Sequence, residues 1–300
     1  MLPLDAIPSS PGKDDYDHSV RLETNELEQE KTYELLAKEP IQGNAVIGVA
    51  GFFLLNVVAL RGTRCDQAQG SIDHIILIDR SLRVEHFWKE MQPIISSATT
   101  RFGVLNKVHE LIESHKERYF SGGKETCDEY IAIEMHLLSK NLAAGVSWLS
   151  SDEQFRRVKR IFDNQTFIFK RLDLCDLDAF TQLGQILKER KISIDTAYIS
   201  NCMEFVIPQP EQLFYFKSSL EQIIAPDTQV IHTSRSVAKT YLTGQRWLLA
   251  QLVSQRKNEP LEKLLIFKPI VKNERLENGD PAPGSIRLSL IHYAHLIGQL

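Results

Sequence analysis

The 300-residue sequence is poor in cysteine, and none of its four cysteines forms a Cys-x-x-Cys pair. A zinc ribbon needs such pairs, and a disulfide framework is not expected in a long chain with so few thiols. The pair His292 and His295 has no convincing third ligand, so no metal site is expected. These absences predict a cytoplasmic protein in a reducing compartment.

An excess of positive charge is also missing. The formal net charge is −4 and the sequence pI is about 6.2, whereas proteins that bind nucleic acid mainly through charge are basic. No nucleic-acid partner is therefore expected. The longest apolar run, residues 45–60, is short for a membrane span and contains two glycines and Asn56. No membrane span and no secretory signal are expected, although export into a host cell by another route is compatible with the sequence.

Two kinds of apolar segment alternate along the chain. Short runs rich in branched residues predict strands at 44–50, 74–81, 165–174, 193–202 and 228–235. Longer periodic segments predict helices at 52–62, 176–191, 210–224 and 236–255. Strands that are apolar on both faces and separated by helices are typical of a mostly parallel α/β sheet with helices on both faces. Residues 261–271 and 285–294 are predicted to close this sheet as an antiparallel pair.

The second and third predicted strands are separated by residues 82–162, far more than one crossover helix needs. Helical periodicity in this stretch predicts a helical insertion or lid within a domain that spans residues 21–300. Ser150 and Glu153 are spaced to form a capping box for the last helix of the insertion. Residues 1–20, rich in Pro, Ser and Asp, predict a mobile N-terminus, and residues 22–40 predict a helix that ends at Pro40.

Polar residues and glycines follow the carboxyl ends of the predicted strands, where open parallel sheets bind their ligands. Gly48 and Gly51 follow the first strand and leave backbone N–H groups open to close approach. Asp79 ends the second strand and can accept hydrogen bonds from both hydroxyls of a ribose. Asp173 and Asp176 follow the third strand, where a carboxylate can accept from an exocyclic amine.

The fourth predicted strand ends in Ser200 and Asn201, with Tyr198 before them and Glu204 after them. Asn201 offers a donor and an acceptor at the depth where a reacting group would lie. A purely structural interpretation stays open for each position: a glycine can serve helix packing, an aspartate can cap a helix, and Ser200 with Asn201 can form a turn. Because these residues fall at successive strand ends, we expect one shared ligand pocket.

This ordered set resembles the S-adenosylmethionine-dependent methyltransferase superfamily, whose seven-strand sheet is Rossmann-like. The resemblance runs from about Asn44 to the C-terminus through VIGVAG, LIDRS, LDLCDLD and YISNCMEF, and is closest to a bacterial group with a YxSN motif. It implies S-adenosylmethionine as cofactor and an adenosine-bearing small molecule as ligand. The implied cofactor-binding residues are Gly48, Ala50, Gly51, Asp79, Arg80, Asp173, Leu174 and Ser200. The implied acceptor-orienting, catalytic residues are Tyr198, Asn201 and Glu204.

The first motif departs from the superfamily pattern, acid-x-Gly-x-Gly-x-Gly. Ala50 stands at a usual glycine position, no acid precedes Gly48, and Phe52 can either wall the pocket or block it. Ala50 and Phe53 break the Gly-x-Gly-x-x-Gly pattern of nicotinamide-dependent oxidoreductases, and Asp79 lies farther away than the ~20 residues usual for their acidic residue, so that class is disfavoured.

Methyl transfer to an unidentified acceptor is the expected function. In-line displacement at a sulfonium methyl needs alignment more than acid–base help, so the lack of a catalytic His or Lys does not oppose it. The alternative is a catalytically inactive fold of this kind that binds a protein partner through the helical insertion. Exposure of Phe87, Trp88 or Trp148 would support the alternative, and their full burial would count against it.

Overall fold

The computed structural model describes residues 6, 7, 9, 18–23, 26, 27, 29–49, 51–66, 70–121, 124–200, 202, 206, 209–234, 239–244 and 286–290. Three predicted site residues, Ala50, Asn201 and Glu204, lie outside this set, as do residues 261–271 of the expected closing strand pair. None of the helices in the described ranges is both long and apolar enough to cross a membrane.

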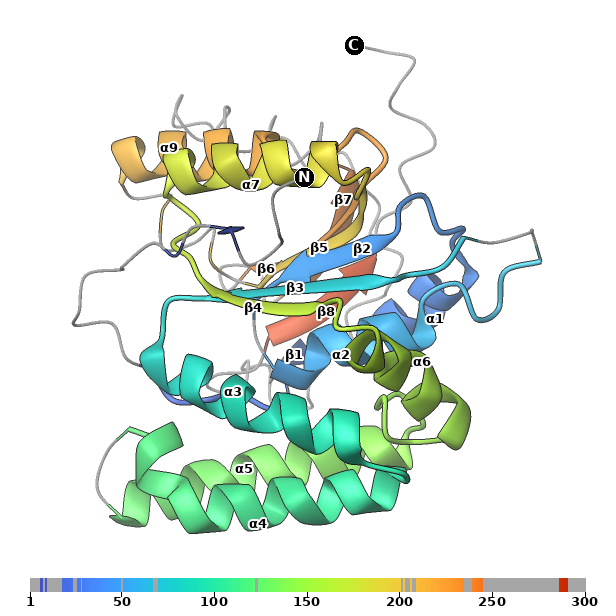
Figure 1. Ribbon diagram of the computed structural model, residues 1–300, viewed down its shortest axis with the longest axis vertical. Coiled ribbons are helices and arrows are strands. Elements are labelled where there is room, and N and C mark those ends of the chain that lie inside the picture. The colour runs from blue at the N-terminus through green and yellow to red at the C-terminus, as the bar shows by residue number, and fades with distance from the viewer. Residues whose placement is uncertain are drawn as a thin grey trace, which may run out of the picture.

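One sheet holds the described strands together, in the order β1-β8-β7-β6-β5-β2-β3-β4 (Figure 1). Its core is five parallel strands: β2 (Ala45–Gly48), β3 (His74–Asp79), β4 (Phe167–Arg171), β5 (Ile194–Ser200) and β6 (Gln229–Ser234). The chain runs outward from β2 through β3 to β4, then returns to the other side of β2 for β5 and β6. This order is Rossmann-like, and it confirms the predicted α/β class with a parallel sheet. The direction of winding reverses between β2 and β5.

The edge of the sheet beyond β6 differs from the prediction. Residues 236–255 were expected to form a helix, but β7 (Lys239–Gly244) is a strand antiparallel to β6. This strand is defined by its pairing with β6, a tertiary contact that local periodicity does not report. β8 (Ile286–Leu290) pairs in parallel with β7 and with β1 (Glu26–Leu27), so no antiparallel closing pair is found in the described residues.

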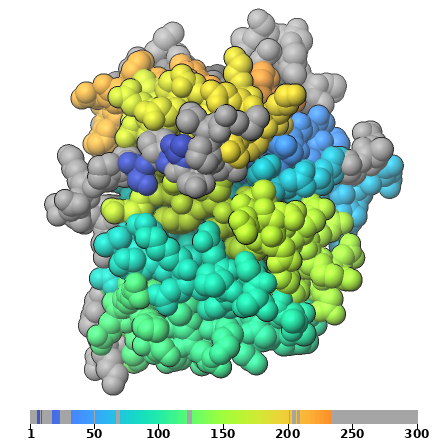
Figure 2. Space-filling model, in the orientation of Figure 1, coloured from blue at the N-terminus to red at the C-terminus, as the bar shows by residue number. Residues whose placement is uncertain are grey.

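Helices cover both faces of the sheet (Figure 1). One face carries α7 (Leu177–Glu189) and α9 (Pro210–Glu221). The other carries α1 (Gln29–Lys38), α2 (Gly51–Leu60), α3 (Leu82–Ser97) and α6 (Asp152–Asp163). Beyond α3 lie α4 (Arg101–Tyr119) and α5 (Lys124–Ala143). Figure 2 shows α3, α4 and α5 as one continuous surface on the side away from α7 and α9.

Local sequence signals set most helix starts. Asp176 caps α7 as predicted, since its Oδ1 accepts from the N–H of Ala179 at 2.9 Å. Pro210 opens α9, where its missing N–H costs nothing. The cap of α6 is Ser151 rather than the predicted Ser150; its hydroxyl accepts from the N–H of Gln154.

The two faces of the sheet bury separate apolar cores. The core under α7 and α9 contains Phe180 and Phe216. The core between the sheet and α2, α3 and α6 contains the aromatic cluster of Phe52, Trp88 and Trp148. Both tryptophan rings meet the Phe52 ring edge-on, a favourable arrangement for aromatic pairs. Phe52 is therefore a core residue that closes the space behind the first motif.

Candidate functional site

The carboxyl ends of β2 and β5 lie against each other at the reversal point of the sheet. The N–H of Val49 donates to the carbonyl of Tyr198 at 3.0 Å. A Cβ added to Gly48 would lie 2.5 Å from that same carbonyl oxygen. A side chain at position 48 would collide with β5, so the close approach of the two strands requires a glycine there. Strand packing therefore explains Gly48 without a ligand.

The second glycine of the motif faces another part of the chain. A Cβ on Gly51 would collide with the carbonyl oxygens of Arg21 and Leu22. The N–H of Phe52, in the first turn of α2, donates to the Leu22 carbonyl at 2.5 Å. First-turn N–H groups have no partner within their helix and attract negative charge. Here the chain itself supplies the acceptor that a ligand would otherwise provide.

Asp79, the predicted ribose-binding acid, is also hydrogen-bonded to a residue near the N-terminus, close in the chain to Arg21 and Leu22. The carboxylate is only 7% exposed at the end of β3. Its Oδ1 accepts from Nε2 of His18 at 2.9 Å and from the N–H of Ser81 at 2.8 Å. The Ser81 hydroxyl donates in turn to the His18 carbonyl. We refer to residues 18–23 as the N-terminal segment.

His18 has the surroundings of a charged imidazolium. Its other nitrogen, Nδ1, lies 2.9 Å from the Ser19 carbonyl, which can only accept. Both ring nitrogens therefore face acceptors. Burial of the ring opposes protonation, but the hydrogen bond and charge of Asp79 outweigh it and raise the pKa of His18 above its ordinary value.

The N-terminal segment is also fastened to the helices between β3 and β4. The N–H of Val20 donates to the carbonyl of Tyr119 at the end of α4. Glu134, fully buried on α5, accepts from the N–H groups of Leu22 and Glu23 and from Nη1 of Arg21 at 2.9 Å. Sequence composition predicted a mobile chain through residue 20, whereas Ser19 and Val20 are buried.

A second buried carboxyl group ends the segment. Oε2 of Glu23 accepts from the side-chain amides of Asn56 on α2 and Asn141 on α5, both at 2.9 Å. Its Oε1 is buried without a hydrogen-bond partner among the described residues. Burial, despite these two amides and helped by the charge of Glu134, raises the pKa of Glu23 to about 8.

The acids after β4 lie at the same end of the sheet. Arg80 follows β3 and pairs with Asp173, with 3.4 Å between Nε and Oδ2. The other oxygen of Asp173 accepts from the N–H of Cys175. Both side chains of the pair are partly exposed, and Leu174 beside them is buried. Asp176 is used as the cap of α7, as its structural interpretation holds.

Two predicted site residues at the end of β5 differ in their surroundings: Tyr198 packs in the core, and Ser200 has a strained backbone. Tyr198 is buried, and its ring centroid lies 4.1 Å from that of Phe53, so it packs in the core of the α2 face. Ser200 has φ +47°, in the left-handed region that non-glycine residues seldom adopt. The pairing of β5 with β6 shifts register between these two residues. Backbone strain of this kind is often stored where a fold binds a ligand.

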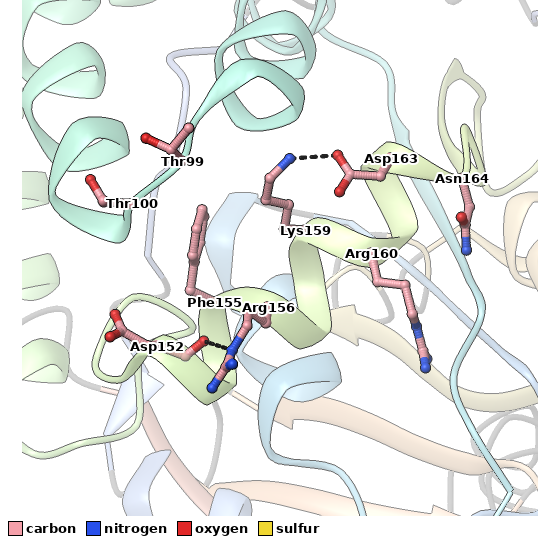
Figure 3. Close-up of a pocket in the computed structure, with 9 residues that line it drawn as sticks. All are labelled: Thr99, Thr100, Asp152, Phe155, Arg156, Lys159, Arg160, Asp163 and Asn164. Carbon is pink, nitrogen blue, oxygen red and sulfur yellow. Dashed lines mark hydrogen bonds and ion pairs between the residues drawn. The ribbon is translucent and has the colours of Figure 1, made fainter.

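The described structure also has an open hollow elsewhere, with a volume of about 550 Å³ (Figure 3). It lies between α6 and the turn from α3 to α4 at Thr99 and Thr100. Lys159 pairs with Asp163 at 2.6 Å along its wall. None of the predicted site residues lines it, so it is separate from the strand-end site.

Sequence reasoning missed the N-terminal segment as a component of the site. The one signal present was the alternation in HSVRLE, residues 18–23, where Val20 and Leu22 are both buried. Because the preceding stretch is rich in Pro and Ser, residues 1–20 were predicted to be mobile, and this short alternation was not interpreted as ordered structure.

The molecule is thus an α/β protein with a Rossmann-like parallel sheet and a strand-end site that its own N-terminal segment contacts. Residues 74–265 match a family described as a domain of unknown function, DUF7790. Since the match takes in well over half of the chain, the chain belongs to this family. The matched range starts at β3, so it includes Asp79 and the helices that follow. A search of curated proteins finds no match.

Proposed function

We propose that this protein is a methyltransferase that binds S-adenosylmethionine at the carboxyl ends of β2, β3 and β4. One observation carries the proposal: Asp79, a nearly buried carboxylate at the end of β3, accepts a hydrogen bond from a group outside the sheet. A buried carboxylate needs a donor, and the two hydroxyls of a ribose are suitable donors for it.

The neighbouring groups suit the rest of such a cofactor. The Phe52 N–H at the start of α2 can receive a carboxylate in place of the Leu22 carbonyl. Asp173, partly exposed beside Leu174, can accept from an adenine amine. The strained Ser200 lies at the end of β5, the strand next to β2.

The proposed reaction is an in-line displacement. A lone pair of the acceptor forms a bond to the methyl carbon, while the carbon–sulfur bond breaks and its electron pair stays on sulfur. The products are S-adenosylhomocysteine and a methylated acceptor, which gives up a proton if it was protonated. The protein's contribution is alignment. Tyr198 packs in the core and is withdrawn as an acceptor-orienting residue, so Asn201 and Glu204 stay the candidates.

The alternative of an inactive fold that binds a protein through its helical insertion has less support. That hypothesis calls for exposed aromatic residues on the insertion. The three aromatic residues named for it, Phe87, Trp88 and Trp148, are completely buried and pack in the core with Phe52. Phe102 on α4 is exposed, but it is a single aromatic side chain rather than a cluster of the three.

Calorimetric titration with S-adenosylhomocysteine tests the proposal. Heat of binding is expected at micromolar ligand, and Asp79→Asn should abolish it while the far-ultraviolet circular dichroism stays unchanged. Asp178→Asn is the matched control, because Asp178 is an exposed carboxylate in the first turn of α7. Equal affinity in the Asp79→Asn and Asp178→Asn proteins would contradict the assignment of Asp79 to the ribose.

A further inference from the structure

The groups assigned to the cofactor are the groups that the N-terminal segment contacts. His18 donates to Asp79, and the Leu22 carbonyl accepts from the N–H of Phe52. The Arg21 carbonyl fills the space beside Gly51. We propose that residues 18–23 are an internal competitor of the adenosine-bearing cofactor, which binds only when this segment leaves the ends of β2 and β3. This inference rests on the proposed function.

Simultaneous occupancy is excluded by distance. The carbonyls of Arg21 and Leu22 approach Gly51 so closely that not even a methyl group fits between them. The Phe52 N–H has a single hydrogen to donate, and the Leu22 carbonyl already accepts it. A cofactor that used this N–H and the Asp79 carboxylate would have to displace the backbone at residues 21 and 22 together with the His18 ring.

Release of the segment requires a buried part of the fold to open. Residues 18–23 belong to no strand, but Val20 and Leu22 are buried in the core, and the N–H of Val20 donates to the Tyr119 carbonyl. The other hydrogen bonds of the segment include those to the side chains of Asp79, Ser81, Ser121 and Glu134. The side chains of His18 and Arg21 are 37% and 42% exposed, so local opening can begin at these two residues.

The same contacts couple the site to the helices after β3. Glu134 on α5 holds the backbone at Leu22 and Glu23, and the end of α4 holds Val20. Movement of α4 or α5 away from the sheet would therefore withdraw the anchors of the segment.

The test compares the full chain with His18→Ala by calorimetric titration of S-adenosylhomocysteine. Loss of a hydrogen bond between charged groups should weaken the competitor, so the affinity should rise about tenfold or more. His109→Ala, which changes an exposed histidine on α4, should leave the affinity unchanged. Hydrogen exchange of the Val20, Leu22 and Glu23 amides is the second readout, and saturating ligand should accelerate it.

Three outcomes distinguish the failure of the competitor proposal from the failure of the methyltransferase proposal. Equal affinity in both chains, with no change in exchange at residues 20–23, would overturn the competitor and leave the methyltransferase proposal standing. Faster exchange in His18→Ala without any ligand binding would overturn the methyltransferase proposal, since the segment would be released from an unused site. Slow exchange in His18→Ala and no binding would overturn both, because the segment would then be a fixed part of the fold.

Discussion

The imidazole of His18 and the carboxylate of Asp79 form a hydrogen-bonded pair at 2.9 Å, although 61 positions separate them in the chain. The pair joins the N-terminal segment to the end of β3. It also brings a donor to the acidic side chain that we propose binds the ribose of the cofactor. Ligand binding at this site is therefore expected to depend on whether the hydrogen bond between His18 and Asp79 is formed or broken.

Cofactor affinity should depend on pH through this pair. The pKa of His18 is raised above 6.5 in the folded chain, so its hold on Asp79 is complete below that pH and is lost as the pH rises through the raised pKa. The charged groups around the ring are Asp79 on β3 and Arg21 within the segment. Affinity for S-adenosylhomocysteine should be higher at pH 8.5 than at pH 6. Because Glu23 in the same segment also loses its proton at about pH 8, the comparison is made in a Glu23→Gln background, where adding His18→Gln should remove most of the remaining difference. A wild-type affinity that is the same at both values would refute the role of the pair.

Stability should depend on pH through Glu23. In the unfolded chain this carboxyl ionises near pH 4.5, whereas in the folded chain it keeps its proton until about pH 8. The folded state thus binds the extra proton over that range, and its contribution to stability falls as the pH rises from about 4.5 to about 8. Glu23→Gln keeps the shape and removes the titration. It should stabilise the chain at pH 8 relative to wild type by on the order of a few kcal/mol, and much less at pH 5.

Urea unfolding midpoints at the two pH values measure this effect. Comparing the two chains at each pH cancels the contributions of groups other than Glu23. A difference between Glu23→Gln and wild type that does not change with pH would show that Glu23 titrates normally.

Gly51→Ala should loosen the N-terminal segment. The added methyl group would collide with the carbonyls of Arg21 and Leu22, and backbone cannot yield as a flexible side chain does. We expect a loss of about 1–3 kcal/mol in the free energy of unfolding and faster hydrogen exchange of the Leu22 amide. Gly103→Ala in α4 is the control, since its new methyl group would meet only the Thr100 hydroxyl at 3.3 Å. Unchanged stability and exchange in Gly51→Ala would show that the segment lies farther from α2.

Arg61→Leu should be strongly destabilising. The Arg61 guanidinium is completely buried at the end of α2 and forms two hydrogen bonds to Asp195 on β5, at 2.8 and 3.1 Å. Removing one partner leaves the other charge buried and unpaired, which costs about 3–5 kcal/mol. Thermal unfolding checks this, with Arg64→Leu on the exposed turn as control. A loss below about 1 kcal/mol would mean that water replaces the guanidinium.

The central architecture could be read from the sequence because its signals are local. Buried strands such as 74–81 and caps such as Asp176 depend on residues close in the chain, and the parallel sheet follows from their alternation. Strand β7 was missed because residues 236–255 were predicted as a helix, while the pairing with β6 that defines Lys239–Gly244 is a tertiary contact.

The candidate site was predicted in part for the same reason. The carboxyl ends of parallel strands share one edge, so Asp79 and Asp173 were placed correctly at the same end of the sheet. The partners of these groups were not predictable. The bond from His18 to Asp79, and those from Leu22 and Glu23 to Glu134, join residues more than 60 positions apart. No local pattern specifies such contacts.

The most direct measurement is calorimetric titration of S-adenosylhomocysteine into the full-length His18→Ala protein, alongside His18→Ala combined with Asp79→Asn. The account predicts micromolar binding to the single variant and none to the double variant, with both folded by circular dichroism. Absence of binding to the folded single variant, or equal binding to both, would contradict an adenosine-cofactor site at Asp79.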